Sequence, residues 1–450
     1  EIRLAGTETD DVLTSRSHGL GLVRDRQRGR GGDGADTPRN PIESHGRKGT
    51  EIAPQNSGDW RPFWLRSCHA FGVTESQKTT PDITIPTDLL PSDGRFGSGP
   101  TKVRSEALDA LAARATDFMG TSHRKMPVKL VVAEMRNGIA ELLRAPDGYE
   151  IVCGNGGSTG FWDAAVFGLI DEKSHHLSFG EFGGKFAKAV AMAPHLQDPS
   201  VTESAMGTRP DLEPVDGVDA YAFTHNETST GVMMDPVRVG GDNDLMLVDA
   251  TSAAGGLMFD ANATDVYYFA PQKALASDGG LWIAMMSPAA IERVERIANS
   301  GRYIPPSLNL WSAVENSRQD QTYNTPALAT IFLTAQTTNW FNDNGGLSWS
   351  AGRSATSAEI LYGWADASDA ASPFVQVESE RSKVVATIDF DEAIDADTLV
   401  EVLRKNGILD VGGYRKLGRN QLRIGMFPAI DPADTEALTA CLDYCIQAMS

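Results

Sequence analysis

Cysteines, long apolar runs and basic residues are all scarce in this chain of 450 residues. Its four cysteines are too few and too scattered for a disulfide framework, and no stretch approaches the roughly 18 apolar residues of a membrane-spanning helix. Lys and Arg number 40 against 60 Asp and Glu, a formal net charge of −20. Such a chain repels phosphate backbones and is a poor non-specific nucleic-acid binder, although a few local cations can still form a pocket for a small anion.

The rest of the composition is that of an ordinary globular protein, with 41% hydrophobic and 22% charged residues. The longest apolar run, residues 279–291, contains Ser287 and Pro288 and predicts a buried strand and a turn. Cys441 and Cys445 lie four residues apart in a helical pattern, so we interpret them as residues of one helix face.

The first 72 residues differ from the rest of the chain. They contain almost equal numbers of basic and acidic residues, have no sustained helical or strand period, and include a basic Arg-Gly run at residues 24–32. That run can be a nucleic-acid contact or part of a solvated, disordered tail, and the second interpretation is favoured. A true translation start near Val73 would also account for the different character of the first 72 residues. The segment has no secretory-signal pattern, and we expect a cytoplasmic protein.

From Pro81 onward, short apolar runs alternate with helical stretches. Strands are predicted at residues 149–153, 176–178, 220–224, 245–248 and 266–269, and helices at 103–115, 128–143 and 161–169. This α/β alternation predicts a mostly parallel sheet with helices on both faces, whose ligands bind beyond the carboxyl ends of the strands.

The pattern changes near Asn344. Helices are predicted at 354–364 and 395–406 and strands at 383–390 and 421–426, which indicates a smaller α+β domain. We therefore divide the chain into an extension at 1–78, a large domain at 79–345 and a small domain at 346–450.

A glycine-rich loop, residues 154–160, follows the first predicted strand and opens a helix. Glycines let backbone N–H groups approach an anion, and the helix N-terminus adds positive potential, so the loop can bind a phosphate. It lacks the lysine of a nucleotide P-loop. Taken alone, an ordinary loop is the favoured interpretation, because glycine-rich loops are common.

Two ionisable residues follow later strands. Asp249 ends one apolar strand and can pair with a cationic heterocycle or act as a helix cap. Lys273 follows the next strand, with apolar flanks that would lower its pKa and make it a nucleophile, although a surface lysine is the alternative.

A polar loop, residues 225–231, follows another strand and offers the hydrogen-bond donors Asn226 and Thr228. Together, an anion cradle, an acid and a strand-end lysine are the parts that a pyridoxal-phosphate site requires: the cradle binds the phosphate, the acid pairs with the ring nitrogen and the lysine forms the Schiff base.

These motifs resemble phosphoserine aminotransferases, in the form typical of actinobacteria. The resemblance runs from about Asp82 to Met449 and rests on residues 94–102, 120–124, 154–168, 225–231, 267–280, 323–326 and 414–426. It implies pyridoxal-phosphate fold type I and a homodimer with shared sites. It also implies amino transfer from glutamate to 3-phosphohydroxypyruvate, giving phosphoserine and 2-oxoglutarate, in serine biosynthesis. The resemblance also allows activity on the phosphorylated four-carbon acid of vitamin B6 synthesis.

The resemblance also implies roles for individual residues. Lys273 would bind the cofactor covalently, Asp249 would pair with its ring nitrogen, and Thr228 would bind its ring hydroxyl. The phosphate would be held by Gly157, Ser158 and Gln272, with Asn324 and Thr325 from the other subunit. The family usually stacks a tryptophan on the ring, and Phe182 stands at the matching position.

For the substrate, the resemblance implies that His123 and Arg124 bind the distal anion across the dimer, that Arg415 assists and that Arg423 binds the α-carboxylate. Arg415 and Arg423 belong to a basic cluster with Lys416 and Arg419, which can also be a surface patch. Tyr414 stands where the family often has histidine. Two planar guanidinium groups suit a substrate with an anion at each end.

Other functions remain open at this stage. An alanine–glyoxylate aminotransferase of the same fold would not need the His123–Arg124 pair, and a cysteine desulfurase would need a reactive cysteine on a mobile loop. A non-catalytic scaffold would not need the Lys273–Asp249 pair. We expect no bound metal, no nucleic-acid partner and no membrane contact.

Overall fold

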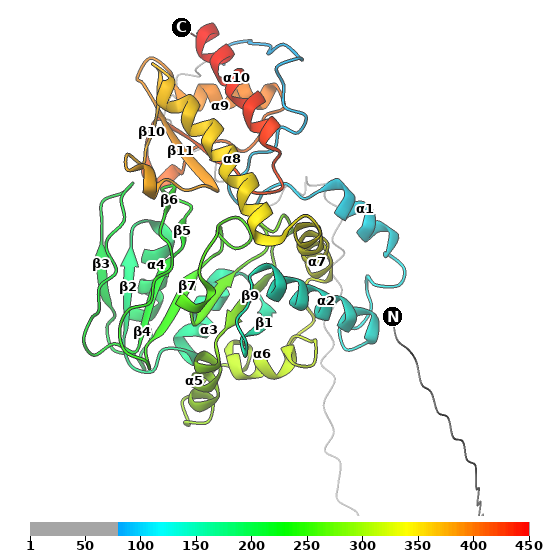
Figure 1. Ribbon diagram of the computed structural model, residues 1–450, viewed down its shortest axis with the longest axis vertical. Coiled ribbons are helices and arrows are strands. Elements are labelled where there is room, and N and C mark those ends of the chain that lie inside the picture. Colours follow the sequence, from blue (N-terminus) through cyan, green and yellow to red (C-terminus); the bar gives the residue numbers. More distant parts are fainter. Residues whose placement is uncertain (1–79, 450) are drawn as a thin grey trace, which may run out of the picture. The chain divides into compact units, whose positions relative to one another are not determined.

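A seven-stranded mixed sheet lies at the centre of the larger part of the chain (Figure 1). The computed structural model describes residues 80–449, so the extension, its basic run and Cys68 lie outside the described residues. The strands are β1 (Glu150–Asn155), β2 (Ser174–Ser178), β3 (Ser200–Glu203), β4 (Ala220–Thr224), β7 (Leu245–Asp249), β8 (Val266–Phe269) and β9 (Leu281–Met286), in the order β1-β9-β8-β7-β4-β2-β3. All neighbouring pairs are parallel except those of β9, which is antiparallel to β1 and β8.

Alternate residues of these strands enter two separate cores, because side chains alternate between the faces of a sheet. Leu247 belongs to the core beneath α3 (Ser158–Gly168), α4 (Glu181–Ala191), α5 (Pro288–Ala298) and α6 (Leu310–Ser317). Its neighbour Val248 belongs to the core beneath α2 (Met126–Leu142) and α7 (Leu328–Asp343), with α1 (Ser105–Ala113) beside α7. The predicted mostly parallel sheet with helices on both faces is confirmed.

A second, three-stranded antiparallel sheet has its own core. It consists of β10 (Ala371–Pro373), β11 (Val385–Phe390) and β12 (Gln421–Gly425), packed with α8 (Gly346–Ala367), α9 (Ala396–Lys405) and α10 (Pro432–Met449). Cys441 and Cys445 are buried together in α10 as interpreted. Ile85 and Phe96, far earlier in the chain, complete this core. The two-stranded sheet β5 (Asn226–Glu227) and β6 (Val232–Met233) follows β4.

Among residues 80–449, no helix is both long enough and apolar enough to cross a lipid bilayer. The same residues contain no group of three or more His, Cys, Asp or Glu side chains that could hold a metal ion.

Candidate active site

Three polar residues meet at one edge of the large sheet. Thr224 and Asp249 end the parallel strands β4 and β7 and are register partners, and Lys273 follows β8, which is parallel to β7. Since parallel strands present their carboxyl ends at the same edge, the topology brings together residues that lie far apart in the sequence.

A cavity of about 280 Å³ lies at this edge. It is lined by Gly99, Gly157, Ser158, Thr159, Trp162, Phe182, Thr224, Asn226, Thr228, Asp249, Thr251, Ser252, Gln272 and Lys273. The structure thus brings together every predicted cofactor-binding residue except Asn324 and Thr325.

Lys273 is buried, with 7% of its surface exposed, and its Nζ donates a hydrogen bond to Thr228 Oγ1 at 2.9 Å. Burial lowers the pKa of this amine to about 8, and the nearby Asp249 carboxylate opposes the shift. The chain passes so close that a Cβ on Gly99 would lie 2.5 Å from Lys273 Cε. The amine is therefore confined and readily available in its neutral, nucleophilic form.

Asp249 is a buried carboxylate with hydrogen bonds to both oxygens. Thr251 donates to Oδ1 from its N–H at 2.9 Å and from its hydroxyl at 2.5 Å, and the Trp162 indole donates to Oδ2 at 3.2 Å. Burial raises the pKa of Asp249, whereas these donors and Lys273 oppose the rise. A carboxylate stabilised in this way can pair with a protonated heterocycle.

The glycine loop leads directly into α3. Gly156 has a φ of +116°, a conformation that favours glycine, Gly157 is the N-cap, and Ser158 is the first helical residue. Gly157, Ser158 and Thr159 all face the cavity, so the positive end of the helix opens into it. Gln272 lies there too, and its side-chain Oε1 is buried without a hydrogen-bond partner.

The ring of Phe182 flanks the amine, with its centroid 5.2 Å from Lys273 Nζ. Its position at the start of α4 is fixed by the buried carboxylate of Glu227, which accepts hydrogen bonds from the N–H groups of Phe182 and Gly183 at 3.0 and 3.2 Å. Ser229 donates two further hydrogen bonds to the same carboxylate. Glu227 therefore holds the aromatic wall of the cavity in place.

Arg423 approaches the site from β12. Its Nη1 is 3.4 Å from the Thr228 carbonyl, its guanidinium lies 5.1 Å from the Tyr414 ring, and its buried Nε has no hydrogen-bond partner. Burial lowers the pKa of Arg423, which remains a cation at neutral pH. A partly buried, incompletely paired guanidinium near Lys273 is suited to bind a carboxylate.

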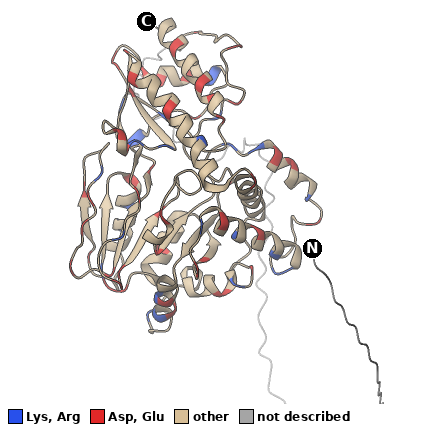
Figure 2. Cartoon of the chain, in the orientation of Figure 1, with Lys and Arg blue, Asp and Glu red and all other residues tan. Residues whose placement is uncertain are grey.

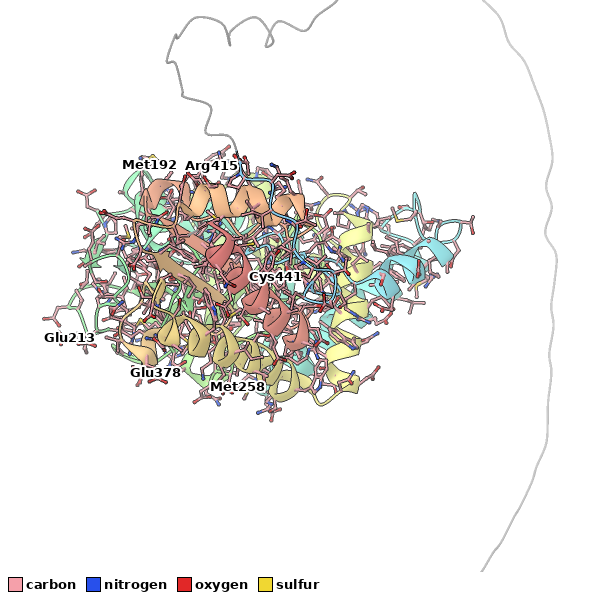
Figure 3. The ribbon with its side chains drawn as sticks, turned by 90° about the horizontal axis from the view of Figure 1, so that it is seen from above. Met192, Glu213, Met258, Glu378, Arg415 and Cys441 are labelled. Carbon is pink, nitrogen blue, oxygen red and sulfur yellow. The ribbon has the colours of Figure 1, made fainter. Side chains whose placement is uncertain are left out.

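The other members of the basic cluster have different surroundings. Lys416 forms an ion pair with Glu181, and Arg419 forms one with Asp389. Arg415 is exposed and lies at the margin of the described chain in Figure 3. The cluster thus divides into one partly buried cation, Arg423, and three exposed cations. Elsewhere in the described chain, basic and acidic residues are interspersed (Figure 2).

Four predicted residues lie together outside the cavity of their own chain. His123 Nδ1 is 3.1 Å from Thr325 Oγ1, and Arg124 Nη1 donates to Gln321 Oε1 at 2.9 Å. Asn324 adjoins Thr325, whose carbonyl accepts a hydrogen bond from the side chain of Asn155 in the glycine loop. His123 Nε2 is buried without a partner, and burial lowers the pKa of the ring. Thus, these residues form a polar cluster beside the loop and do not line the cavity.

Sequence reasoning missed several cavity residues. Thr251 and Ser252 directly follow Asp249, and Trp162 lies one helical turn after Ser158, so spacing from residues already identified was the available signal. Thr224, whose hydroxyl is buried without a partner, ends the strand before the polar loop.

The cavity fits pyridoxal phosphate. A helix N-terminus for the phosphate, a buried carboxylate for the ring nitrogen, an aromatic wall and a buried amine of lowered pKa all face one space. Its volume is close to the lower end of the about 300–1,000 Å³ of small-molecule sites. The unpartnered oxygens of Thr224, Asn226 and Gln272 provide further polar contacts.

Comparison with known proteins gives a consistent result. The family model "Aminotransferase class-V" matches residues 95–415. The chain is 56% identical over 370 residues to the phosphoserine aminotransferase of a Nocardioides species, covering 82% of this chain and 99% of that protein. It is 54% identical to the phosphoserine aminotransferase of Rhodococcus jostii, covering 80% and 97%.

Among solved structures, the phosphoserine aminotransferase of Cytophaga hutchinsonii has a similar fold. It superposes with a TM-score of 0.71 at 21% identity, covering 78% of this chain and 99% of that one. This likeness supports the type I fold of pyridoxal-phosphate enzymes.

Proposed function

Because the chain belongs to the class-V aminotransferases, and within them to the phosphoserine aminotransferase family, we propose that it transfers an amino group from glutamate to 3-phosphohydroxypyruvate in serine biosynthesis. The products are phosphoserine and 2-oxoglutarate. The observation that carries the proposal is the partly buried guanidinium of Arg423, whose Nε is unpartnered and which lies close to the Lys273 amine.

Pyridoxal phosphate, when bound, supplies an aldehyde for amine capture and a ring that withdraws electrons from the carbon bearing the amine. Gly157, Ser158 and Gln272 would hold its phosphate, Asp249 its ring nitrogen, Thr228 its ring hydroxyl and Phe182 one ring face. Lys273 would hold it covalently. The lining of the cavity by these side chains supports the assignments.

The residues of the chain account for both halves of the reaction. Arg423 would bind the α-carboxylate, which glutamate and phosphoserine share. Lys273 Nζ, neutral at moderately alkaline pH, would accept the proton from the substrate α-carbon and later return one. The low exposure of Lys273, 7% of its surface, limits the access of bulk water to this amine.

We also propose a homodimer in which His123, Arg124, Asn324 and Thr325 enter the site of the partner subunit. The polar cluster that they form is flanked by the exposed apolar side chains Met119, Met126, Leu130 and Tyr323, which are 41%, 61%, 61% and 44% exposed. Exposed apolar groups around a polar cluster indicate an interface. Arg124 and Arg415 would then bind the distal phosphate or carboxylate.

The direct test is an amino-transfer assay of the purified protein with glutamate and 3-phosphohydroxypyruvate, compared with glyoxylate and pyruvate as acceptors. We expect phosphoserine formation to exceed transfer to the unphosphorylated acids by at least about tenfold, since phosphate carries nearly two charges at neutral pH. Equal or better transfer to glyoxylate would favour the alanine–glyoxylate alternative.

A further inference from the structure

The indole of Trp162 is buried, with 4% of the residue exposed, and lies between two polar groups of the central sheet. Its N–H donates to Asp249 Oδ2 at 3.2 Å and to the Tyr268 hydroxyl at 3.0 Å. Trp162 also lines the Lys273 cavity. It is therefore the residue of α3 that contacts the candidate ring-nitrogen acid directly.

Helix α3 also reaches the other oxygen of this carboxylate. Ser158 Oγ lies 2.5 Å from Thr251 Oγ1, which donates to Asp249 Oδ1. Ser158 and Trp162 are four residues apart, so they lie on one face of α3. Helix α3, whose N-terminus would bind the phosphate, therefore contacts one Asp249 oxygen directly through Trp162 and the other indirectly through Ser158 and Thr251.

The chemistry of the donors favours the ionised carboxylate. An indole N–H can only donate, so it stabilises the carboxylate and competes with a proton for Oδ2. Burial and the Asp249 charge hold the pKa of the Tyr268 phenol well above its usual range, so that phenol keeps its proton. The Trp162 hydrogen bond opposes the rise in the Asp249 pKa that burial alone would cause. The Tyr268 phenol also has a side-chain hydrogen bond with Asp249, which contributes to the raised pKa of the phenol.

We propose that Trp162 is a positioning residue that keeps Asp249 ionised and oriented toward the ring nitrogen of the cofactor. This inference rests on the proposed function, because it requires pyridoxal phosphate in the cavity. The alternative is that Trp162 only fills the core, where its ring stacks on Phe186 at 6.1 Å and 13°.

The test compares two ligands in equilibrium binding to the cofactor-free protein, followed by fluorescence. One is pyridoxal phosphate, and the other is the analogue in which carbon replaces the ring nitrogen. A packing defect weakens both, whereas a defect in the Asp249 hydrogen bond weakens only the ligand that has the nitrogen. We expect Trp162→Phe to lower the ratio of the two affinities about tenfold, as for loss of one hydrogen bond to a charged group.

Trp282→Phe is the matched control. Trp282 is 5% exposed and packs on Phe161 rather than on Asp249, so the affinity ratio should stay within about twofold of wild type. Tyr268→Phe, which keeps the ring stacked on Phe161, tests the same network if Trp162→Phe does not fold, and should lower the ratio in the same direction.

An unchanged ratio in folded Trp162→Phe would overturn the proposal, as would an equal change in Trp282→Phe. If Trp162→Phe does not fold, an unchanged ratio in Tyr268→Phe would overturn it as well. Failure of the wild-type protein to bind pyridoxal phosphate would instead remove the proposed function itself.

Discussion

Lys273 Nζ and Thr228 Oγ1 are joined by a hydrogen bond of 2.9 Å within the cavity at the edge of the large sheet. The Thr228 hydroxyl in turn donates to Ser252 Oγ at 2.9 Å. The lysine amine is thus held at a fixed position by a chain of two hydroxyl groups. Burial supplies the second condition for reactivity, because it brings the pKa of the amine down to about 8.

Covalent capture of pyridoxal phosphate should follow the neutral fraction of Lys273. Below pH 8 the amine is mostly protonated and unreactive, so the capture rate should rise with pH through a midpoint near 8 and level off above it. The rate is measured from the visible absorbance of the bound cofactor in buffers from pH 6 to 10. A midpoint near that of an exposed lysine, above 10, would contradict the burial argument.

Asp249→Asn tests the origin of this pKa. The Asp249 carboxylate raises the pKa of Lys273, so its removal should move the capture midpoint below that of the wild type.

Lys273→Ala should abolish capture altogether, and borohydride-trapped cofactor in the wild type should map to the Lys273 peptide. Trapping on another lysine would disprove the assignment.

Arg423→Ala should impair both half-reactions, because glutamate and phosphoserine both carry an α-carboxylate. Loss of a buried charged hydrogen bond costs about 2–5 kcal/mol, or roughly 30- to 4,000-fold in kcat/KM. Single-turnover kinetics with each amino donor measures the two effects separately. Arg419→Ala is the control: its exposed guanidinium pairs with Asp389 and should change kcat/KM less than about threefold.

If Arg423→Ala weakened only the phosphorylated substrate, Arg423 would bind the distal anion instead. Arg415→Ala, by contrast, is expected to weaken mainly the phosphorylated substrate, because Arg415 would bind the distal anion. Its side chain is exposed in one chain, and its effect should be larger for phosphoserine than for glutamate.

The parallel strands were predictable because their apolar runs are short and end in polar residues. Strands β4 and β8 span the predicted residues. Helix α7 was not predicted, since it is buried on most sides and has no apolar stripe: Thr330, Thr334, Thr337 and Thr338 are all buried within it. Helix α8 also extends beyond the predicted 354–364 at both ends.

The site was predictable where a residue follows a strand and unpredictable where two elements cross. Asp249 and Lys273 could be found by their position at strand ends. The contact of Trp162 with Asp249 depends on how α3 packs across the end of β7, which no local pattern encodes. A role for His123 and Arg124 in the site requires the proposed homodimer, and sequence pattern within one chain cannot place residues across such an interface.

Glu227→Gln should lower the stability of the cofactor-free protein. The amide keeps the size of the side chain but replaces one acceptor oxygen with a donor. That donor would face either the N–H groups of Phe182 and Gly183 or the N–H and hydroxyl of Ser229. The expected cost is about 1–3 kcal/mol in free energy of unfolding, measured by urea denaturation. Glu392→Gln, at an exposed turn, should be neutral within about 0.5 kcal/mol, and equal effects would mean that the Glu227 hydrogen bonds contribute nothing.

Mixing two inactive variants tests whether the site is shared between subunits. Arg124→Ala retains Lys273, and Lys273→Ala retains Arg124, so a mixed dimer has one site with both residues intact if Arg124 crosses the interface. Random subunit exchange makes half of the dimers mixed, which predicts recovery of about a quarter of the wild-type activity. Arg423→Ala mixed with Lys273→Ala is the control, because Arg423 lies beside Thr228 of its own chain and each mixed site keeps one defect. Recovery in the first mixture alone establishes the shared site. Demonstrated exchange without recovery in either mixture places Arg124 within its own chain's site or outside the reaction.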